Sequence, residues 1–172
     1  MEGPVSETIE LERRGRDADL FPDERLAPTG TLLETQVLVA AAIDVRAVDP
    51  VGLDAATADL LVRLAKSADC GISGVDIREQ CQMTATRVSR LVDRAEADGL
   101  VMRTPDPNDR RAQHVVLTDE GREAVRRLAP RLSDVLDELV FETLSAEERQ
   151  VLVELLGRLR DRAREMLADP GK

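Results

Sequence analysis

The chain has 172 residues, the size of one ordinary domain, and carries 24 basic against 34 acidic residues, for a formal net charge of −10. This charge disfavours non-specific attraction to nucleic acid or to an anionic membrane, so any polyanion must bind a local basic surface. Two Phe and no Trp or Tyr exclude base-stacking modules and aromatic cages, which need several rings.

Residues 1–31 are predicted to form an acidic extension that does not fold on its own. The segment has eight acidic and four basic residues, three prolines and few large apolar side chains. A short helix near residues 6–14 is the one element expected in it.

The first long helix is expected over residues 32–49. Apolar side chains recur there at helical spacing until Pro50 and Gly52 end the pattern. Asp54 then occupies the N-cap position of a second helix, which reaches about Lys66. The chain has no uninterrupted apolar run of about 18 residues, so no membrane span is predicted.

Two short helices joined by a tight turn are predicted next. The first covers residues 73–81 and is expected to bury Val75, Ile77 and Cys81. The second covers residues 84–98, and Gly99 follows it in a position typical of a left-handed C-cap.

Two short extended runs come after Gly99, over residues 100–104 and 112–117. Between them, residues 105–109 have the sequence Pro-Asp-Pro-Asn-Asp, which is typical of a turn. These features predict a β-hairpin.

Two long helices are predicted within residues 119–167. In the first, apolar residues three or four positions apart form a seam that packs against another helix: Val125, Leu128, Leu132, Val135 and Leu139. Pro130 lies inside this helix and is expected to kink it or to cost a backbone hydrogen bond. The second opens with a capping box, Ser145-Ala146-Glu147-Glu148. These stripes predict either a homodimer joined through the terminal helices or helices that fold back on their own chain.

The negative charge is distributed unevenly along the chain. Residues 73–114 have no net charge, whereas the segments on both sides are acidic. On the helix 84–98, Arg87, Arg90 and Arg94 fall within about 60° of one another, beside an arc of apolar residues. Such a helix can place Arg and hydroxyl side chains at phosphates or guanine edges in the major groove. An ordinary solvated amphipathic helix is the alternative.

The turn of the hairpin favours the first interpretation. Arg110 and Arg111 come directly after Asp109 at its tip. A protruding Arg suits the narrow minor groove, and Asp109, two residues before Arg111, can hold the guanidinium in place.

These residues resemble the MarR family of winged helix-turn-helix transcription regulators. The family pattern D-x-R, five residues, L-T, two residues, G is matched by Asp109, Arg111, Leu117, Thr118 and Gly121. The helix Thr86-Arg87-Val88-Ser89-Arg90-Leu91-Val92-Asp93-Arg94, followed by Gly99-Leu100-Val101, is also similar to the family consensus.

The resemblance implies a mainly α fold with a small β-hairpin wing, forming a dimer through its N- and C-terminal helices. The expected domain covers residues 32–167, with dimerisation helices at 32–49 and 119–167, a DNA-binding lobe at 54–118 and a tail at 168–172. Arg111 would enter the minor groove, oriented by Asp109. The full set of expected DNA-binding residues is Thr84, Thr86, Arg87, Ser89, Arg90, Arg94, Asp109, Arg110 and Arg111.

The resemblance also implies a regulatory function. Family members usually repress transcription, binding a pseudo-palindromic operator in double-stranded DNA, and release it when a small phenolic or anionic effector binds between the dimer base and the lobe. Asp59 on the second helix, like the N-terminal extension, is similar to the urate- and phenol-responsive branch and is a candidate ligand residue, the alternative being a surface carboxylate. That branch also uses a Trp, which this chain lacks. The turn between the two short helices has Gln82 where the family commonly has Gly.

The sequence has few candidate residues for metal binding, disulfide bonds, redox sensing or catalysis. One His, His114, and two Cys, Cys70 and Cys81, are too few for a zinc site or a disulfide framework. The peroxide-sensing branch of the family that the chain resembles has its reactive cysteine in the first long helix, and this helix has none here, so the resemblance disfavours redox sensing. No nucleophile with a nearby base and no Gly-rich phosphate loop indicates an enzyme. We therefore expect a cytoplasmic protein with no cofactor, no metal and no membrane partner. The hypotheses are a ligand-responsive DNA-binding repressor, a helical protein-interaction module of the same fold that does not bind DNA, and a small-molecule carrier or enzyme.

Overall fold

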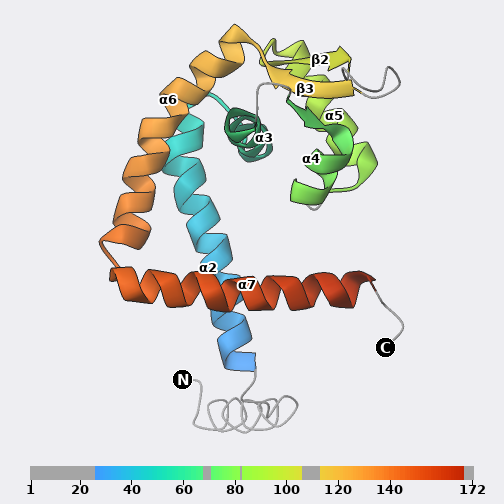
Figure 1. The fold of residues 1–172 in the computed structure, drawn as a ribbon. Helices are drawn as coiled ribbons and strands as arrows, with labels where there is room; N and C mark the ends of the chain where they lie inside the picture. The colour runs from blue at the N-terminus through green and yellow to red at the C-terminus, as the bar shows by residue number, and fades with distance from the viewer. Residues whose placement is uncertain (1–25, 68–70, 82, 106–112, 169–172) are drawn as a thin grey trace, which may run out of the picture. The chain divides into compact units, whose positions relative to one another are not determined.

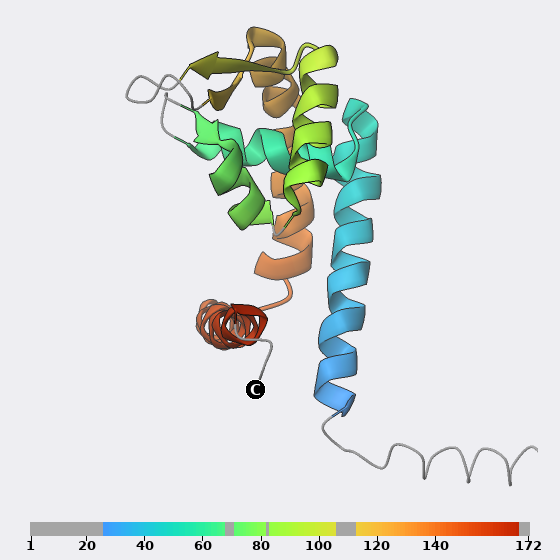
Figure 2. The same cartoon turned by 90° about the vertical axis from the view of Figure 1, so that its right-hand side faces the viewer.

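The computed structural model describes residues 26–67, 71–81, 83–105 and 113–168. The chain divides into two compact units, residues 1–39 and 40–172, and Figures 1 and 2 show the elements in two views. The helix predicted near residues 6–14 and the turn at Gln82 lie outside the described residues.

Helix α2 (Leu26–Ile43) begins earlier than the predicted start at residue 32 and has no buried residue. Pro28 is in its first turn, where a missing N–H costs no helical hydrogen bond. The sequence has no unbroken apolar run of about 18 residues, but the helical stretch Leu26–Val51 is on average long and apolar enough to cross a membrane, by length and composition alone. Isolated polar residues such as Glu34 interrupt the apolar run there without making the segment polar on average.

A turn of π-helix, η1 (Asp44–Val48), and a turn of 3-10 helix, η2 (Asp49–Val51), lead to Gly52, whose φ of 75° is left-handed. Helix α3 (Ala55–Lys66) then begins at its predicted N-cap, because the Thr57 N–H donates to Oδ1 of Asp54 at 3.1 Å. The prediction of this cap is confirmed.

The lobe beyond α3 contains two helices and a small sheet. Helices α4 (Gly74–Cys81) and α5 (Ala85–Ala97) are followed by strands β2 (Val101–Pro105) and β3 (Gln113–Leu117). A further strand, β1 (Ile72–Ser73), was not predicted, and it completes an antiparallel sheet of order β1-β3-β2. This arrangement is the winged helix-turn-helix fold that the resemblance implies.

One core holds this lobe together. Apolar side chains from all its elements meet there and are at most 6% exposed: Leu60, Leu61, Leu64, Ile72, Ile77, Val88, Leu91, Val92, Ala95, Val101, Val115 and Ala124. The expectation that Val75 is buried with Ile77 is wrong, since Val75 is 56% exposed. Residues two positions apart on a helix point about 200° away from each other, so the side chains of Val75 and Ile77 cannot lie on the same face.

Helix α6 (Asp119–Leu136) leaves the sheet through a close contact at Gly121. Thr118 is its N-cap, accepting from the Gly121 N–H at 3.0 Å and donating to the Gly99 carbonyl at 2.6 Å. A Cβ on Gly121 would lie 2.0 Å from the Leu100 carbonyl oxygen. The L-T-x-x-G motif is therefore a helix cap followed by a residue that must have no side chain.

The predicted apolar seam of α6 packs within the chain. Leu128 and Val135, which are buried, join Ala47, Val48 and Ala58 in a second core, and Leu132 and Leu139 pack against it. A bidentate ion pair supports the same contact, with Arg46 on η1 and Glu138 on the π-helical turn η3 (Asp137–Phe141) separated by 2.6 and 2.5 Å. This hydrogen-bonded pairing lowers the pKa of Glu138.

Helix α7 (Ala146–Ala168) begins with the predicted capping box. The Glu148 N–H donates to Ser145 Oγ at 3.2 Å, and the Ser145 N–H donates to Glu148 Oε2 at 2.8 Å. None of the residues of α7 is buried. Its large apolar side chains are between 39% and 76% exposed: Val151, Leu152, Val153, Leu155, Leu156, Leu159, Met166 and Leu167.

Candidate nucleic-acid interface

Helix α5 has one buried face and one exposed face. Val88, Leu91, Val92 and Ala95 are at most 6% exposed and fix the helix on the lobe core. Thr84 is its N-cap, and the side chain accepts from the Arg87 N–H at 3.4 Å. The left-handed Gly99 predicted after the helix has a φ of 73°.

The exposed face of α5 presents the side chains that a helix needs to contact base edges in the major groove, and α5 is called the reading helix below. Thr86, Arg87, Ser89 and Arg90 are all exposed. Within the described part of the chain, neither Arg87 nor Arg90 forms an ion pair, whereas most of the other lobe arginines do. Two guanidinium groups are thus available to phosphates or base edges.

Among the described residues, three of the predicted DNA-binding side chains have intramolecular partners: Thr84, which caps α5, and also Ser89 and Arg94. Ser89 Oγ donates to Asp93 Oδ2 at 3.4 Å. Arg94 Nη2 lies 2.9 Å from Asp54 Oδ1 and 3.3 Å from Thr57 Oγ1, so this side chain joins α5 to the start of α3. Burial alone raises the pKa of Asp54, but hydrogen bonds from Thr57 and the charge of Arg94 outweigh it and lower that pKa. Contacts with DNA stay predictions for all the α5 residues of the predicted set: Thr84, Thr86, Arg87, Ser89, Arg90 and Arg94.

The wing strands β2 and β3 pair in register from Val101 opposite Leu117 to Pro105 opposite Gln113. The predicted hairpin is therefore present, and Figure 2 shows it beside α5. Its tip, with Asp109, Arg110 and Arg111, lies outside the described residues, so the minor-groove role of these residues also stays a prediction.

Sequence reasoning missed Arg103 on β2. Its Nη2 lies 2.6 Å from Asp93 Oδ1, its Nη1 contacts Glu96 Oε2, and its backbone N–H donates to Glu96 Oε1 at 3.2 Å. The sequence does show that Asp93 and Glu96 are three residues apart on α5 and so share a face, which indicates a site for a basic side chain. It does not show that this side chain is Arg103.

Asp59 has partners of its own. Its Oδ2 lies 2.8 Å from Arg63 Nε and accepts a longer contact, 3.5 Å, from Cys81 Sγ. Burial, then the nearby charge of Asp59, raises the pKa of the Cys81 thiol, which disfavours the reactive thiolate. In the described residues, no group of three or more His, Cys, Asp or Glu side chains could hold a metal ion. Cys70 lies outside those residues.

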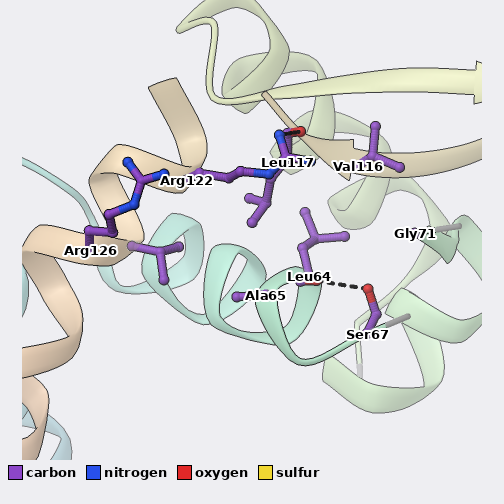
Figure 3. A pocket seen from close by; sticks show the side chains of 9 residues that line it. Leu64, Ala65, Ser67, Gly71, Val116, Leu117, Arg122 and Arg126 are labelled. Atoms are coloured by element: carbon purple, nitrogen blue, oxygen red, sulfur yellow. Dashed lines mark hydrogen bonds between the residues drawn. The ribbon is translucent and has the colours of Figure 1, made fainter. Parts of the chain in front are cut away.

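An open cavity of about 280 Å³ lies where α3, β3 and the first turns of α6 meet (Figure 3). Leu64, Leu117 and Val125 supply apolar walls. The guanidinium of Arg122 donates to the Leu117 carbonyl at 2.9 Å and lies 3.5 Å from Asp119 Oδ1. Arg126, which pairs with Glu123 at 2.5 Å, completes the basic side. Such a cavity suits a small organic anion.

The sequence matches known regulators over this lobe. The model of the MarR family matches residues 51–112. YdgJ of Bacillus subtilis, an uncharacterized HTH-type transcriptional regulator, is 32% identical over 90 residues, which are 52% of this chain and 54% of the relative. This chain therefore spans about half the length of that regulator.

Two solved structures extend the similarity beyond the lobe. Sco3205 from Streptomyces coelicolor, a MarR family transcriptional regulator solved in complex with DNA, is 30% identical with a TM-score of 0.74, covering 80% of this chain and 87% of that one. CouR from Rhodococcus jostii RHA1, solved with bound p-coumaroyl-CoA, is 25% identical with a TM-score of 0.62, covering 83% and 92%.

Proposed function

The chain belongs to the MarR family, and we propose that it is a ligand-responsive transcription regulator that binds an operator in double-stranded DNA. The observation that carries the proposal is the exposed face of α5, where Arg87 and Arg90 have no ion-pair partner in the described residues while the opposite face is buried. DNA-bound Sco3205 supports the same function. We assign the protein no enzymatic activity.

Binding is tested with a duplex selected from a random-sequence library, using fluorescence anisotropy over a range of salt concentrations. Arg87→Ala and Arg90→Ala are each expected to lose about 1 to 3 kcal/mol of binding free energy if the side chain reads a base. If it contacts a phosphate, the slope of log affinity against log salt concentration should fall by about 1. Arg131→Ala, which removes an exposed Arg from α6, is the control and should bind normally. Failure of the wild type to select or bind any duplex at low salt would refute the function and favour the protein-interaction module.

We also propose that the protein acts as a homodimer in the cytoplasm, with repression as its mode of regulation. The exposed apolar side chains of α7 would leave a large patch in water if the chain stayed alone. A homodimer buries the patch against an identical surface. Sedimentation equilibrium should give twice the chain mass of 18.9 kDa, and Leu155→Asp should lower the measured mass toward that of a single chain.

The apolar stretch Leu26–Val51 supplies a competing prediction, because by length and composition it can cross a membrane. Cell fractionation separates the two possibilities. Recovery in the high-speed supernatant supports the cytoplasmic assignment, and retention in the membrane pellet after a salt wash contradicts it.

The effector is proposed to be a small organic anion bound in the cavity of Figure 3, with Arg122 as its partner. The cavity beside Asp59 suits an anion less well, because Asp59 and Asp76 line it, whereas no carboxylate of the described residues lines the cavity of Figure 3. Benzoate titrated into labelled protein should shift the amide NMR signals of Ala65 and Val125, and Arg122→Met should abolish the shifts. Equal shifts in this variant would refute the role of Arg122, and no shifts of Ala65 and Val125 in the wild type would exclude the site.

A further inference from the structure

Arg103 joins the wing to the reading helix through three contacts. Two come from its guanidinium, to Asp93 at 2.6 Å and to Glu96, and the third from its backbone N–H to Glu96 at 3.2 Å. The side chain is 26% exposed, the least of any residue in the described ion pairs. Val101, two residues earlier on β2, is 2% exposed in the lobe core, so both side chains point from the strand toward the helix.

These contacts restrict how the strand can move. A planar guanidinium that contacts two carboxylates one helical turn apart fixes both position and direction, unlike a pair held at a single point. The partner strand β3 follows, because it pairs with β2 over five residues. The hydrogen bond with Asp93 is the main reason that the pKa of Arg103 is raised.

We propose that Arg103 is a positioning residue, which holds the wing at a fixed angle to α5 so that both elements meet neighbouring grooves of one duplex. The inference rests on the proposed DNA binding. It assigns Arg103 no contact with DNA, and it predicts that Asp93 and Glu96 are required for binding although both carry the sign of charge that DNA repels.

A purely electrostatic role would have a different consequence. Arg103 also neutralises two carboxylates on the reading helix, and Asp93 is 59% exposed, one turn from Arg90. If neutralisation were its whole contribution, replacing the carboxylates by amides would strengthen binding. If positioning matters, the same replacement weakens it, because a neutral amide holds a guanidinium poorly.

The test compares the full-length wild type, Arg103→Met, Arg103→Lys and the double variant Asp93→Asn/Glu96→Gln on the selected duplex. Hydroxyl-radical footprinting reports minor-groove protection by the wing, and anisotropy reports affinity. Arg103→Met and the double variant are expected to lose the protections that flank the major-groove site and to bind about tenfold more weakly or worse. Arg103→Lys keeps the charge but lacks the planar guanidinium that contacts two carboxylates, so its affinity and protections should lie between those of these variants and the wild type.

Arg162→Met is the matched control, because it removes the same charge from an ion pair with Glu165 on α7. It should leave the footprint unchanged. Wild-type affinity and protections in the double variant, or tighter binding, would overturn the inference while leaving the proposed function intact.

Amide hydrogen exchange of the free protein tests the same idea without DNA. Arg103→Met should speed exchange in β2 and β3 and leave α6 unchanged, with an unaltered circular dichroism spectrum as the check on folding. Unchanged exchange in the two strands would refute the positioning role even if no duplex were bound, whereas failure of the wild type to bind DNA would refute the proposed function alone.

Discussion

Replacing Gly121 with Ala tests the contact that joins the lobe to α6. The new Cβ would lie 2.0 Å from the Leu100 oxygen and 3.2 Å from Leu117 Cδ2. A carbon and an oxygen normally approach to about 3.3 Å, so the helix must shift by about 1.3 Å relative to Leu100. That carbonyl also accepts the Thr118 N–H at 3.1 Å, and Ala124, one turn further along α6, is 1% exposed.

The cost follows from these contacts. Overpacking costs about 1 to 3 kcal/mol and weakening one hydrogen bond about 1 kcal/mol, while Ala gains about 0.5 to 1 kcal/mol over Gly in a helix. The expected loss is about 1 to 3.5 kcal/mol, or about 2 to 14 °C in Tm for a chain of this length.

Urea titration followed by circular dichroism measures the change. Gly74→Ala is the control, because its Cβ would meet nothing within 4 Å and it lies at the start of a helix in the same lobe. It should be neutral or stabilising by up to about 1 kcal/mol. If Gly121→Ala were as stable as Gly74→Ala, the close contact at Leu100 would not be a feature of the folded protein.

Three further predictions concern the cores, a cap and acid stability. Leu128→Ala should cost about 2 to 5 kcal/mol in urea titrations because Leu128 is 1% exposed, and a loss below 1 kcal/mol would argue against the second core. Ser145→Ala should cost about 1 kcal/mol through loss of the α7 cap, and no change would mean that the capping box contributes nothing. The folded pKa of Asp54 is below its usual 3.8, so the unfolded state binds more protons near that pH and the carboxylate's contribution disappears as pH falls through the folded pKa. Asp54→Asn should therefore flatten the decline of stability below about pH 4, and a decline as steep as the wild type's would contradict this role.

Local chemistry explains what could be predicted from sequence. The caps Asp54 and Ser145 were identifiable because each bonds to an N–H three residues away, a distance set by helix geometry. The hairpin was identifiable for a similar reason, since its turn residues and its alternating strands adjoin. The buried face of α5 followed from helical periodicity.

The missed features depend on residues far apart in the chain. Arg94 was expected to face DNA with Arg87 and Arg90, but Asp54, 40 positions away, supplies a partner that periodicity on α5 cannot reveal. Strand β1 has two residues and exists only because β3 offers an edge to pair with. In both cases the sequence of the element itself contains no signal.

The distribution of ion pairs over the lobe gives the proposed DNA binding a basis for selectivity in an acidic chain. Arg94 and Arg103 neutralise carboxylates of the lobe and fix its elements, which leaves Arg87 and Arg90 as the unpaired cations on the described part of the reading helix. The whole chain carries a charge of −10, so a DNA duplex repels it. Arg87 and Arg90 can overcome this repulsion only if both contact the DNA at the same time. Non-specific affinity is therefore expected to be low and to show a shallow salt dependence, with discrimination resting on the geometry that Arg103 holds.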